Sequence, residues 1–140
     1  MANASLYDGA TAMGEAALMA MRVTRRNKVC YGNKIHPHYI EVTDTYLRNN
    51  EAEFFSADED PEQIDDQTAC VIIQSPDFFG KPHAYAQWRQ ACDEKGALLV
   101  VVVNEIVSLG LLPAPVEADI VCGEAQSIGV AMSYGGPHLG

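Results

Sequence analysis

Two continuous apolar segments, residues 69–73 and 97–103, constrain the fold of this chain more than any other feature. Both are rich in β-branched side chains and lack the apolar–polar alternation of a half-exposed strand, as expected for strands covered on both faces. Residues 82–95 between them have helical spacing, with Trp88 on the apolar side, and Gly96 is suited to end that helix. Together the three segments predict a right-handed βαβ crossover and a parallel sheet.

A helix over residues 9–26, capped by Asp8, is predicted near the start of the sequence. The apolar face of this helix is expected to carry Ala12, Ala16, Met19 and Val23. The other predicted elements are strands over 28–31, 53–57, 119–122 and 130–134, a helix over 37–49, and one helical turn near Glu62. Strands that alternate with helices predict a single α/β domain over residues 1–140, a three-layer α/β/α sandwich with a mainly parallel sheet.

The composition argues against several classes of function. A net charge of −10 is unfavourable for nucleic-acid binding, which needs clustered Lys and Arg side chains. No apolar run approaches the roughly 18 residues that span a bilayer, and the first five residues lack a secretory signal, so a cytoplasmic location is expected. Acidic residues 58–62 lack the spacing of a calcium loop, and the cysteines and histidines lack zinc-binding spacing. We therefore predict no metal, and reduced, structural cysteines.

Ligands of parallel sheets bind at the carboxyl ends of the strands, so the loops there are candidates for a site. These loops are residues 32–38, 74–80, 104–110 and 123–129, and the helix start at residues 8–11 would offer N–H groups for an anion at the same rim. The sequence has no Gly-x-Ser-x-Gly turn, no P-loop and no Gly-x-Gly-x-x-Gly after a strand. The residues alone therefore predict an α/β domain without specifying an activity.

Several short motifs add a resemblance to a known family. The most specific one reads GEAQSIGV at residues 123–130, followed by SYGGPHLG at residues 133–140. Weaker motifs precede it in order and are YDGATA at 7–12, EAALMA at 15–20 with Arg22, His36-Pro37, and QSPDFFG at 74–80. In this order they resemble the N-terminal half of glycine decarboxylase, the P-protein of the glycine cleavage system, which is called subunit 1 where the enzyme is split.

That resemblance implies the large domain of a fold-type I pyridoxal-phosphate-dependent transferase, of which this chain would be a central part. It also implies the reaction of the family, in which glycine is decarboxylated on pyridoxal phosphate and its aminomethyl group passes to the lipoyl arm of a carrier protein. In the family the working site belongs to the other half. The implied partners are therefore a second, pyridoxal-phosphate-bearing subunit and the lipoyl carrier protein.

The matching positions lack the residues that would hold the cofactor covalently. The resemblance places Gln126 at the position of the Schiff-base lysine and Asn104 where an aspartate would meet the pyridine nitrogen, and a glutamine amide cannot form an imine. None of the four lysines lies within residues 119–129. We expect no catalytic residue and no covalently bound cofactor in this chain, and we predict a supporting or vestigial site made of His36, Asn104, Gln126 and His138.

Two other interpretations stay open at this point. A truncated α/β binding or assembly module without enzymatic activity fits the charge and the missing lysine equally well. A self-sufficient transferase or lyase of the same fold would require a lysine within reach of the site. Apolar surface that a longer chain would cover also predicts self-association.

Overall fold

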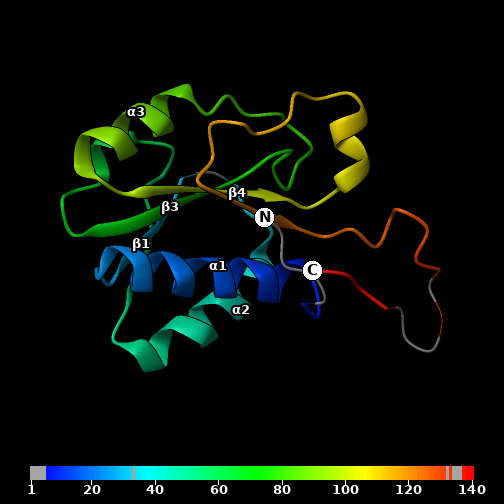
Figure 1. The fold of residues 1–140 in the computed structure, drawn as a ribbon, viewed down its shortest axis with the longest axis horizontal. Helices are drawn as coiled ribbons and strands as arrows, with labels where there is room; N and C mark the ends of the chain where they lie inside the picture. The colour runs from blue at the N-terminus through cyan, green and yellow to red at the C-terminus, as the bar shows by residue number, and fades with distance from the viewer. Residues whose placement is uncertain (1–5, 33, 132, 134–136) are drawn as a thin grey trace.

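Five parallel strands form one sheet at the centre of the molecule, in the order β2-β1-β3-β4-β5 (Figure 1). The computed structural model describes residues 6–32, 34–131, 133 and 137–140. The strands are β1 (Lys28–Tyr31), β2 (Glu53–Ser56), β3 (Thr68–Gln74), β4 (Leu98–Val103) and β5 (Ile120–Gly123). The predicted parallel pairing of the two apolar segments is confirmed, with Cys70 opposite Leu98 and Ile73 opposite Val101.

Helices cover both faces of the sheet because its central strands are apolar on both sides. All seven residues of β3 are buried. Cys70 and Ile72 pack in the core with α1 and α2, whereas Val71 and Ile73 pack on the other face with α3. The helices are α1 (Gly9–Thr24), α2 (Pro37–Leu47) and α3 (Ala86–Lys95). The predicted three-layer α/β/α sandwich is therefore confirmed, with α3 above the sheet and α1 and α2 below it in Figure 1.

Helix α1 begins at the predicted cap, where Oδ1 of Asp8 accepts a 2.7 Å hydrogen bond from the backbone N–H of Thr11. Its predicted apolar face was wrong in part, because Met19 and Val23 are 38% and 67% exposed. The side that faces the core is shifted by about one residue position, since fully buried Ala17 and its neighbours make the contact. Small side chains on this face allow the helix to approach the sheet closely.

Helix α3 begins at Ala86, four residues after the start at residue 82 that the sequence predicted. The preceding loop is held by Asp77, whose Oδ1 accepts 2.9 Å hydrogen bonds from the backbone N–H groups of Phe79 and Lys81. Within the predicted first turn, the backbone N–H of His83 donates a 3.3 Å hydrogen bond to Oγ of Ser75, which holds this segment outside the helix. The predicted end of α3 is confirmed, because Gly96 adopts the left-handed conformation with φ +66°.

The remaining differences are small. Helix α2 ends two residues early and continues as a short 3₁₀ turn, η1. A strand over residues 130–134 is not formed at Val130, Ala131 or Ser133, and the other two positions lie outside the described residues. The 3₁₀ turns are η1 (Arg48–Asn50), η2 (Pro61–Gln63) and η3 (Ile106–Gly110). No helix among the described residues is long and apolar enough to cross a membrane.

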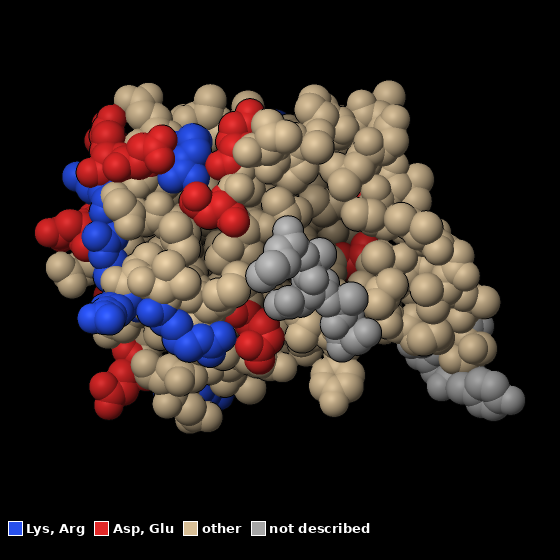
Figure 2. Space-filling model, in the orientation of Figure 1, with Lys and Arg blue, Asp and Glu red and all other residues tan. Residues whose placement is uncertain are grey.

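Charge is distributed unevenly over the face shown in Figure 2. Lys, Arg, Asp and Glu side chains gather on the half farthest from η3, and the half that carries η3 and the loop after β5 shows few of them. Large apolar side chains are exposed in and after η3, namely Val107 and Leu111, and also at Val116, at Val121 in β5 and at Ile128 in the loop after β5.

Candidate functional site

The carboxyl ends of β3, β4 and β5 and the start of α1 lie on the same side of the molecule (Figure 1). The backbone N–H of Gly9, the first residue of α1, donates a 3.2 Å hydrogen bond to Oε2 of Glu124, just after β5. This contact joins residues 115 positions apart. The helix start and the strand ends therefore form one continuous rim, as the sequence predicted.

Asn104, at the end of β4, is paired with a tyrosine of α2. The hydroxyl of Tyr39 donates a 2.5 Å hydrogen bond to Oδ1 of Asn104. Burial, together with the nearby Glu124 and Asp8 carboxylates, raises the pKa of Tyr39 well above its ordinary value, so the phenol stays protonated as a donor. The Asn104 side-chain oxygen is therefore engaged within the chain.

Gly9 lies against the same phenol. A methyl group at Gly9 would lie 2.3 Å from the Tyr39 hydroxyl oxygen and 3.1 Å from Cβ of Glu124. Real Cβ atoms essentially never come as close as 2.3 Å to another heavy atom, so a larger residue at this position would have to displace the Tyr39 hydroxyl. The α1 start, Tyr39 and Glu124 are therefore in direct contact.

His36, the cap of α2, is fixed by three contacts. Its backbone N–H donates a 2.8 Å hydrogen bond to Oε1 of Gln74, and its Nδ1 accepts one of 3.2 Å from the backbone N–H of His38. Its ring packs edge-on against Phe78 with a centroid distance of 4.9 Å. Burial, followed by the charge of His38, lowers the pKa of His36, which favours the neutral imidazole.

Gln126 does not reach Asn104 through any described contact. Its side-chain Nε2 donates a 2.7 Å hydrogen bond to the backbone oxygen of Val130. Its backbone N–H donates a 3.0 Å hydrogen bond to Oε1 of Glu124. The amide therefore stabilises the glycine-containing loop after β5.

His138 lies in the last described segment, beside the same carboxylate. Its Nδ1 is 3.3 Å from Oε2 of Glu124, although the histidine side chain is 56% exposed. The adjacent Leu139 donates its backbone N–H to Oε1 of Glu124 at 2.8 Å. The His36 ring also packs against the Tyr39 ring, with a centroid distance of 5.2 Å. Of the four predicted residues, His36 and Asn104 therefore both contact Tyr39, whereas Gln126 and His138 both contact Glu124.

Sequence reasoning did not single out Glu124 or Tyr39 as site residues. In the sequence, Glu124 stands out only as part of a motif. Its carboxylate oxygens accept hydrogen bonds mainly from backbone N–H groups, and such donors produce no recognisable pattern of side chains. Tyr39 was expected only as a buried residue of α2. A buried tyrosine needs a partner for its hydroxyl, and this general requirement was the one available signal.

A second carboxylate stabilises the loop after β4. Oε1 of Glu105 accepts a 2.5 Å hydrogen bond from the Ser127 hydroxyl and one of 3.1 Å from the backbone N–H of Val107. These two hydrogen bonds, the one from Ser127 first, lower the pKa of Glu105, although partial burial opposes them. This contact joins the β4 and β5 loops.

Beside Glu124, the rim borders an apolar hollow of about 310 Å³. Val103, Leu109, Val121 and Cys122 are among its lining residues. Burial raises the pKa of the Cys122 thiol to about 12, so this thiol is not a ready nucleophile at neutral pH. The hollow therefore suits an apolar group better than a reacting one.

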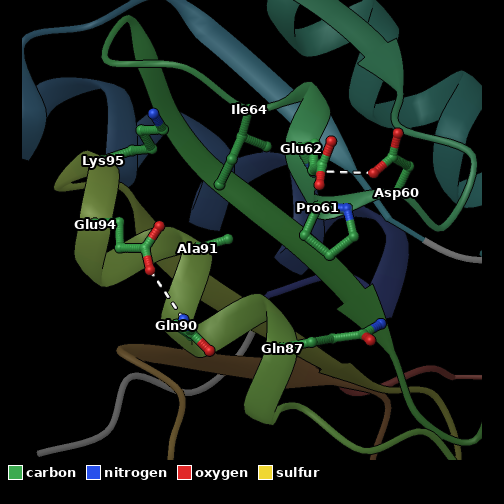
Figure 3. A pocket seen from close by; sticks show the side chains of 9 residues that line it. All are labelled: Asp60, Pro61, Glu62, Ile64, Gln87, Gln90, Ala91, Glu94 and Lys95. Atoms are coloured by element: carbon green, nitrogen blue, oxygen red, sulfur yellow. Dashed lines mark hydrogen bonds between the residues drawn. The ribbon is translucent and has the colours of Figure 1, made fainter.

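A larger hollow of about 460 Å³ lies elsewhere, between α3 and the segment that contains η2 (Figure 3). It shares no lining residue with the rim. Side chains from both walls are largely polar, and Gln90 donates a 2.9 Å hydrogen bond to Glu94 within one of them. Among the described residues no group of three His, Cys, Asp or Glu side chains could hold a metal ion. Size alone does not make this hollow a functional site.

The residues at the rim do not fit the pyridoxal phosphate that the resemblance implies for the family. The amide of Gln126 cannot form an imine, and the Asn104 side-chain oxygen is engaged by the Tyr39 hydroxyl. The anion position at the start of α1 is taken by the carboxylate of Glu124. Lys28, at the opposite end of β1, is paired with Asp65 at 2.8 Å. We derive no reaction step from this cofactor.

Comparisons with known proteins identify the family of the chain. The chain matches the family described as "Glycine cleavage system P-protein" over residues 1–140. It is 46% identical to the probable glycine dehydrogenase (decarboxylating) subunit 1 of Maricaulis maris and 48% identical to that of Rhodospirillum centenum. Each alignment covers 100% of this chain and 33% of the relative. The chain therefore spans about a third of the length of these curated relatives.

Solved structures place the fold in the same group. The crystal structure of glycine decarboxylase (P-protein) of the glycine cleavage system, in inhibitor-bound form, matches with a TM-score of 0.87 and 33% identity, over 96% of this chain and 33% of that one. A transaminase with bound pyridoxal phosphate matches with a TM-score of 0.65 at 20% identity, which shows the fold alone. The sheet and its helices therefore have the fold of the large domain of fold-type I enzymes. With the sequence match over every residue, the conclusion is that this chain belongs to the glycine cleavage system P-protein family.

Proposed function

We propose that this chain is part of subunit 1 of a glycine dehydrogenase (decarboxylating) and acts as the non-catalytic half that supports a site completed by another chain. The observation that carries the proposal is Gln126. Its amide occupies the loop after β5 and is bonded to the backbone oxygen of Val130. An amide at this position supports the loop and cannot bind a carbonyl cofactor as an imine.

The described rim also favours a supporting role. Asn104 is paired with Tyr39, and Glu124 accepts hydrogen bonds from three backbone N–H groups. Polar groups satisfied in this way hold their loops in one arrangement. The proposed contribution to glycine decarboxylation is thus a fixed surface against which a second subunit assembles.

The chemistry in this proposal belongs to the partners. A second subunit would bear pyridoxal phosphate and decarboxylate glycine, and the aminomethyl group would pass to a lipoyl carrier protein. The names of the relatives support this assignment, because they are called subunit 1 of the decarboxylating glycine dehydrogenase.

Co-expression with a lysine-bearing second subunit tests the proposal. We expect a complex in a pull-down, and exchange of carbon dioxide into glycine only when the complex and the carrier protein are present. Reduction with borohydride should then label a lysine of the second subunit. A labelled lysine in this chain would contradict the non-catalytic assignment.

Two lysines on strand-end loops provide matched controls. Lys34 and Lys81 are both exposed; Lys34 lies within the predicted site loop 32–38, and Lys81 directly follows the loop 74–80. The variants Lys34→Arg and Lys81→Arg keep the charge and remove the amine that could form an imine. We expect both variants to support exchange as well as the unmodified chain does.

A second candidate, an α/β binding or assembly module without enzymatic activity, is favoured by the exposed apolar side chains beside β5. Leu111 and Val116 are 90% and 84% exposed, and the apolar hollow of about 310 Å³ lies near β5. The same co-expression experiment separates the candidates. Absence of both a complex and exchange would support the module.

A further inference from the structure

The start of α1 is arranged to attract an anion. The helix is 16 residues long, and its first N–H groups have no acceptor within the helix, so they and the helix dipole favour negative charge. Asp8 satisfies the N–H of Thr11, and the first turn contains no acidic residue. The N–H of Gly9 must therefore find an acceptor from another part of the chain.

That acceptor is the carboxylate of Glu124, which gathers donors from three separate segments. Oε2 accepts from Gly9 at 3.2 Å, and Oε1 accepts from Gln126 at 3.0 Å and from Leu139 at 2.8 Å. Nδ1 of His138 lies 3.3 Å from Oε2, and the Glu124 side chain is only 13% exposed. Both carboxylate oxygens are thus held as the oxygens of a bound oxyanion would be.

The surrounding backbone is packed closely around this carboxylate. A methyl group at Gly9 would lie 3.1 Å from Cβ of Glu124, and one at Gly140 would lie 2.2 Å from the backbone oxygen of Asp8. Leu6 and Gly140 exchange two backbone hydrogen bonds of 3.2 Å beside the site. A phosphate group at this helix start would have to displace the carboxylate, because the two anions repel each other at contact distance.

We propose that Glu124 is a built-in anion that occupies the start of α1, fastens residues 138–140 to it and thereby excludes phosphate-bearing ligands from the rim. The exclusion comes from this chain's own side chain and operates in the isolated protein. It goes beyond the proposed function, because it concerns anion binding by this chain and not its assembly with a second subunit.

Amide hydrogen exchange on the isolated chain tests the fastening. In the unmodified protein the amides of Gly9, Gln126 and Leu139 should be protected. Glu124→Gln should accelerate their exchange by about tenfold or more, since each loses a hydrogen bond to a charged acceptor. The amides of β3 and β4 should not change, which shows that the variant is folded. Unprotected Gly9 and Leu139 amides in the unmodified protein would overturn the proposal.

The exclusion is tested by measuring the binding of inorganic phosphate with calorimetry. The ionic strength is kept constant, with chloride as the balancing anion. We expect Glu124→Ala to bind phosphate at least about tenfold more tightly than the unmodified chain, because the vacated N–H groups accept the new anion. The control Glu105→Gln removes one negative charge from the same rim but leaves Glu124 in place. It should bind phosphate as the unmodified chain does.

Each other outcome counts against the proposal. Equal phosphate binding by the unmodified chain and Glu124→Ala would show that the carboxylate excludes nothing. An equal gain in Glu105→Gln would show a general effect of net charge. If Glu124→Ala does not fold, Glu124→Gln is used in its place; it removes the negative charge that repels phosphate, so the same gain in phosphate binding is expected. The experiment needs no second subunit, so its failure is separate from failure of the proposed function.

Discussion

Tyr39 and Asn104 are 65 positions apart in the sequence and are joined by a hydrogen bond of 2.5 Å between the phenol oxygen and the amide Oδ1. The tyrosine is only 9% exposed, so its hydroxyl has little access to water as an alternative partner. The bond ties helix α2 to the end of β4. It also brings the phenol into contact with the first residue of α1, Gly9.

The Tyr39–Asn104 bond should contribute measurably to stability. We expect Tyr39→Phe and Asn104→Ala each to lower the free energy of unfolding by about 1 kcal/mol or more, because each leaves a polar group without its partner. A double-mutant cycle from urea unfolding should give a coupling energy of about 1 kcal/mol. Tyr46→Phe, on the same helix, is the control and should change stability by less. Strict additivity of the two substitutions would contradict the prediction.

Gly9→Ala should be destabilising for a steric reason. The added methyl group would lie 2.3 Å from the Tyr39 hydroxyl oxygen, and such overpacking costs about 1–3 kcal/mol. The loss should be smaller in a Tyr39→Phe background, because the nearest atom is then removed. Thermal unfolding of the four proteins measures this difference. Gly110→Ala is the control, since a methyl group there meets nothing within 4 Å.

The Asp77–His83 pair predicts a loss of stability in acid. His83 Nε2 lies 2.9 Å from Oδ2 of Asp77, whose side chain is 4% exposed. Burial acts to raise the pKa of Asp77, but hydrogen bonds from His83 and from the backbone of Lys81 and Phe79 outweigh it and lower the pKa. Because the pKa of Asp77 is lower in the folded state, its carboxylate stabilises the fold fully above the pKa of an unfolded aspartate, about 3.9. This stabilisation is lost as the pH falls through the lower pKa of the folded state.

Asp77→Asn should therefore be less stable than the unmodified chain at pH 7, by about 1.5–3 kcal/mol. The difference in the free energy of unfolding between the two proteins should narrow as the pH falls below about 4, because Asp77 of the unmodified chain then becomes protonated. Urea unfolding at several pH values measures both quantities. A gap that stays constant down to pH 3 would show that ionisation of Asp77 does not matter.

Exposed apolar side chains on β5 and directly after η3 predict self-association. Val121 lies on this edge strand and is 51% exposed, and Leu111 is 90% exposed. We expect light scattering to show association that rises with concentration and is weakened by Val121→Lys or Leu111→Glu, because a charge opposes burial of this surface. Val23→Lys on α1 is the control, since Val23 is also exposed, at 67%. A monodisperse monomer at every concentration would refute the prediction.

The elements that the sequence predicted best are those whose patterns arise from burial alone. Residues of β3 and β4 are apolar on both faces, so their run of β-branched side chains identified them within one or two residues. The start of α3 differs from the prediction because the backbone N–H of His83, in the predicted first turn, is bonded to Oγ of Ser75. The spacing of apolar residues alone does not reveal which side chain will form hydrogen bonds with the backbone of a loop.

The candidate site was predictable only as a set of loops. His36, Asn104 and Gln126 lie on strand-end loops and His138 in the last described segment, but their contacts run through Tyr39 and Glu124. Glu124 draws its donors from backbone groups at Gly9, Gln126 and Leu139, which any sequence would supply. Such convergence depends on the three-dimensional packing of distant segments and has no local pattern.

The place of β3 in the middle of the sheet bears on how the chain folds. The strand pairs with β4, which follows it after one helix, and with β1, which precedes it across α2 and β2. Contacts close in sequence form with a smaller loss of loop entropy. Paired residues are 20 positions apart between β4 and β5, 25 between β1 and β2, and 28 between β3 and β4, but 40 or 41 between β1 and β3. The pairing of β1 with the central strand, which joins the two halves of the sheet, is therefore the expected slow step of folding.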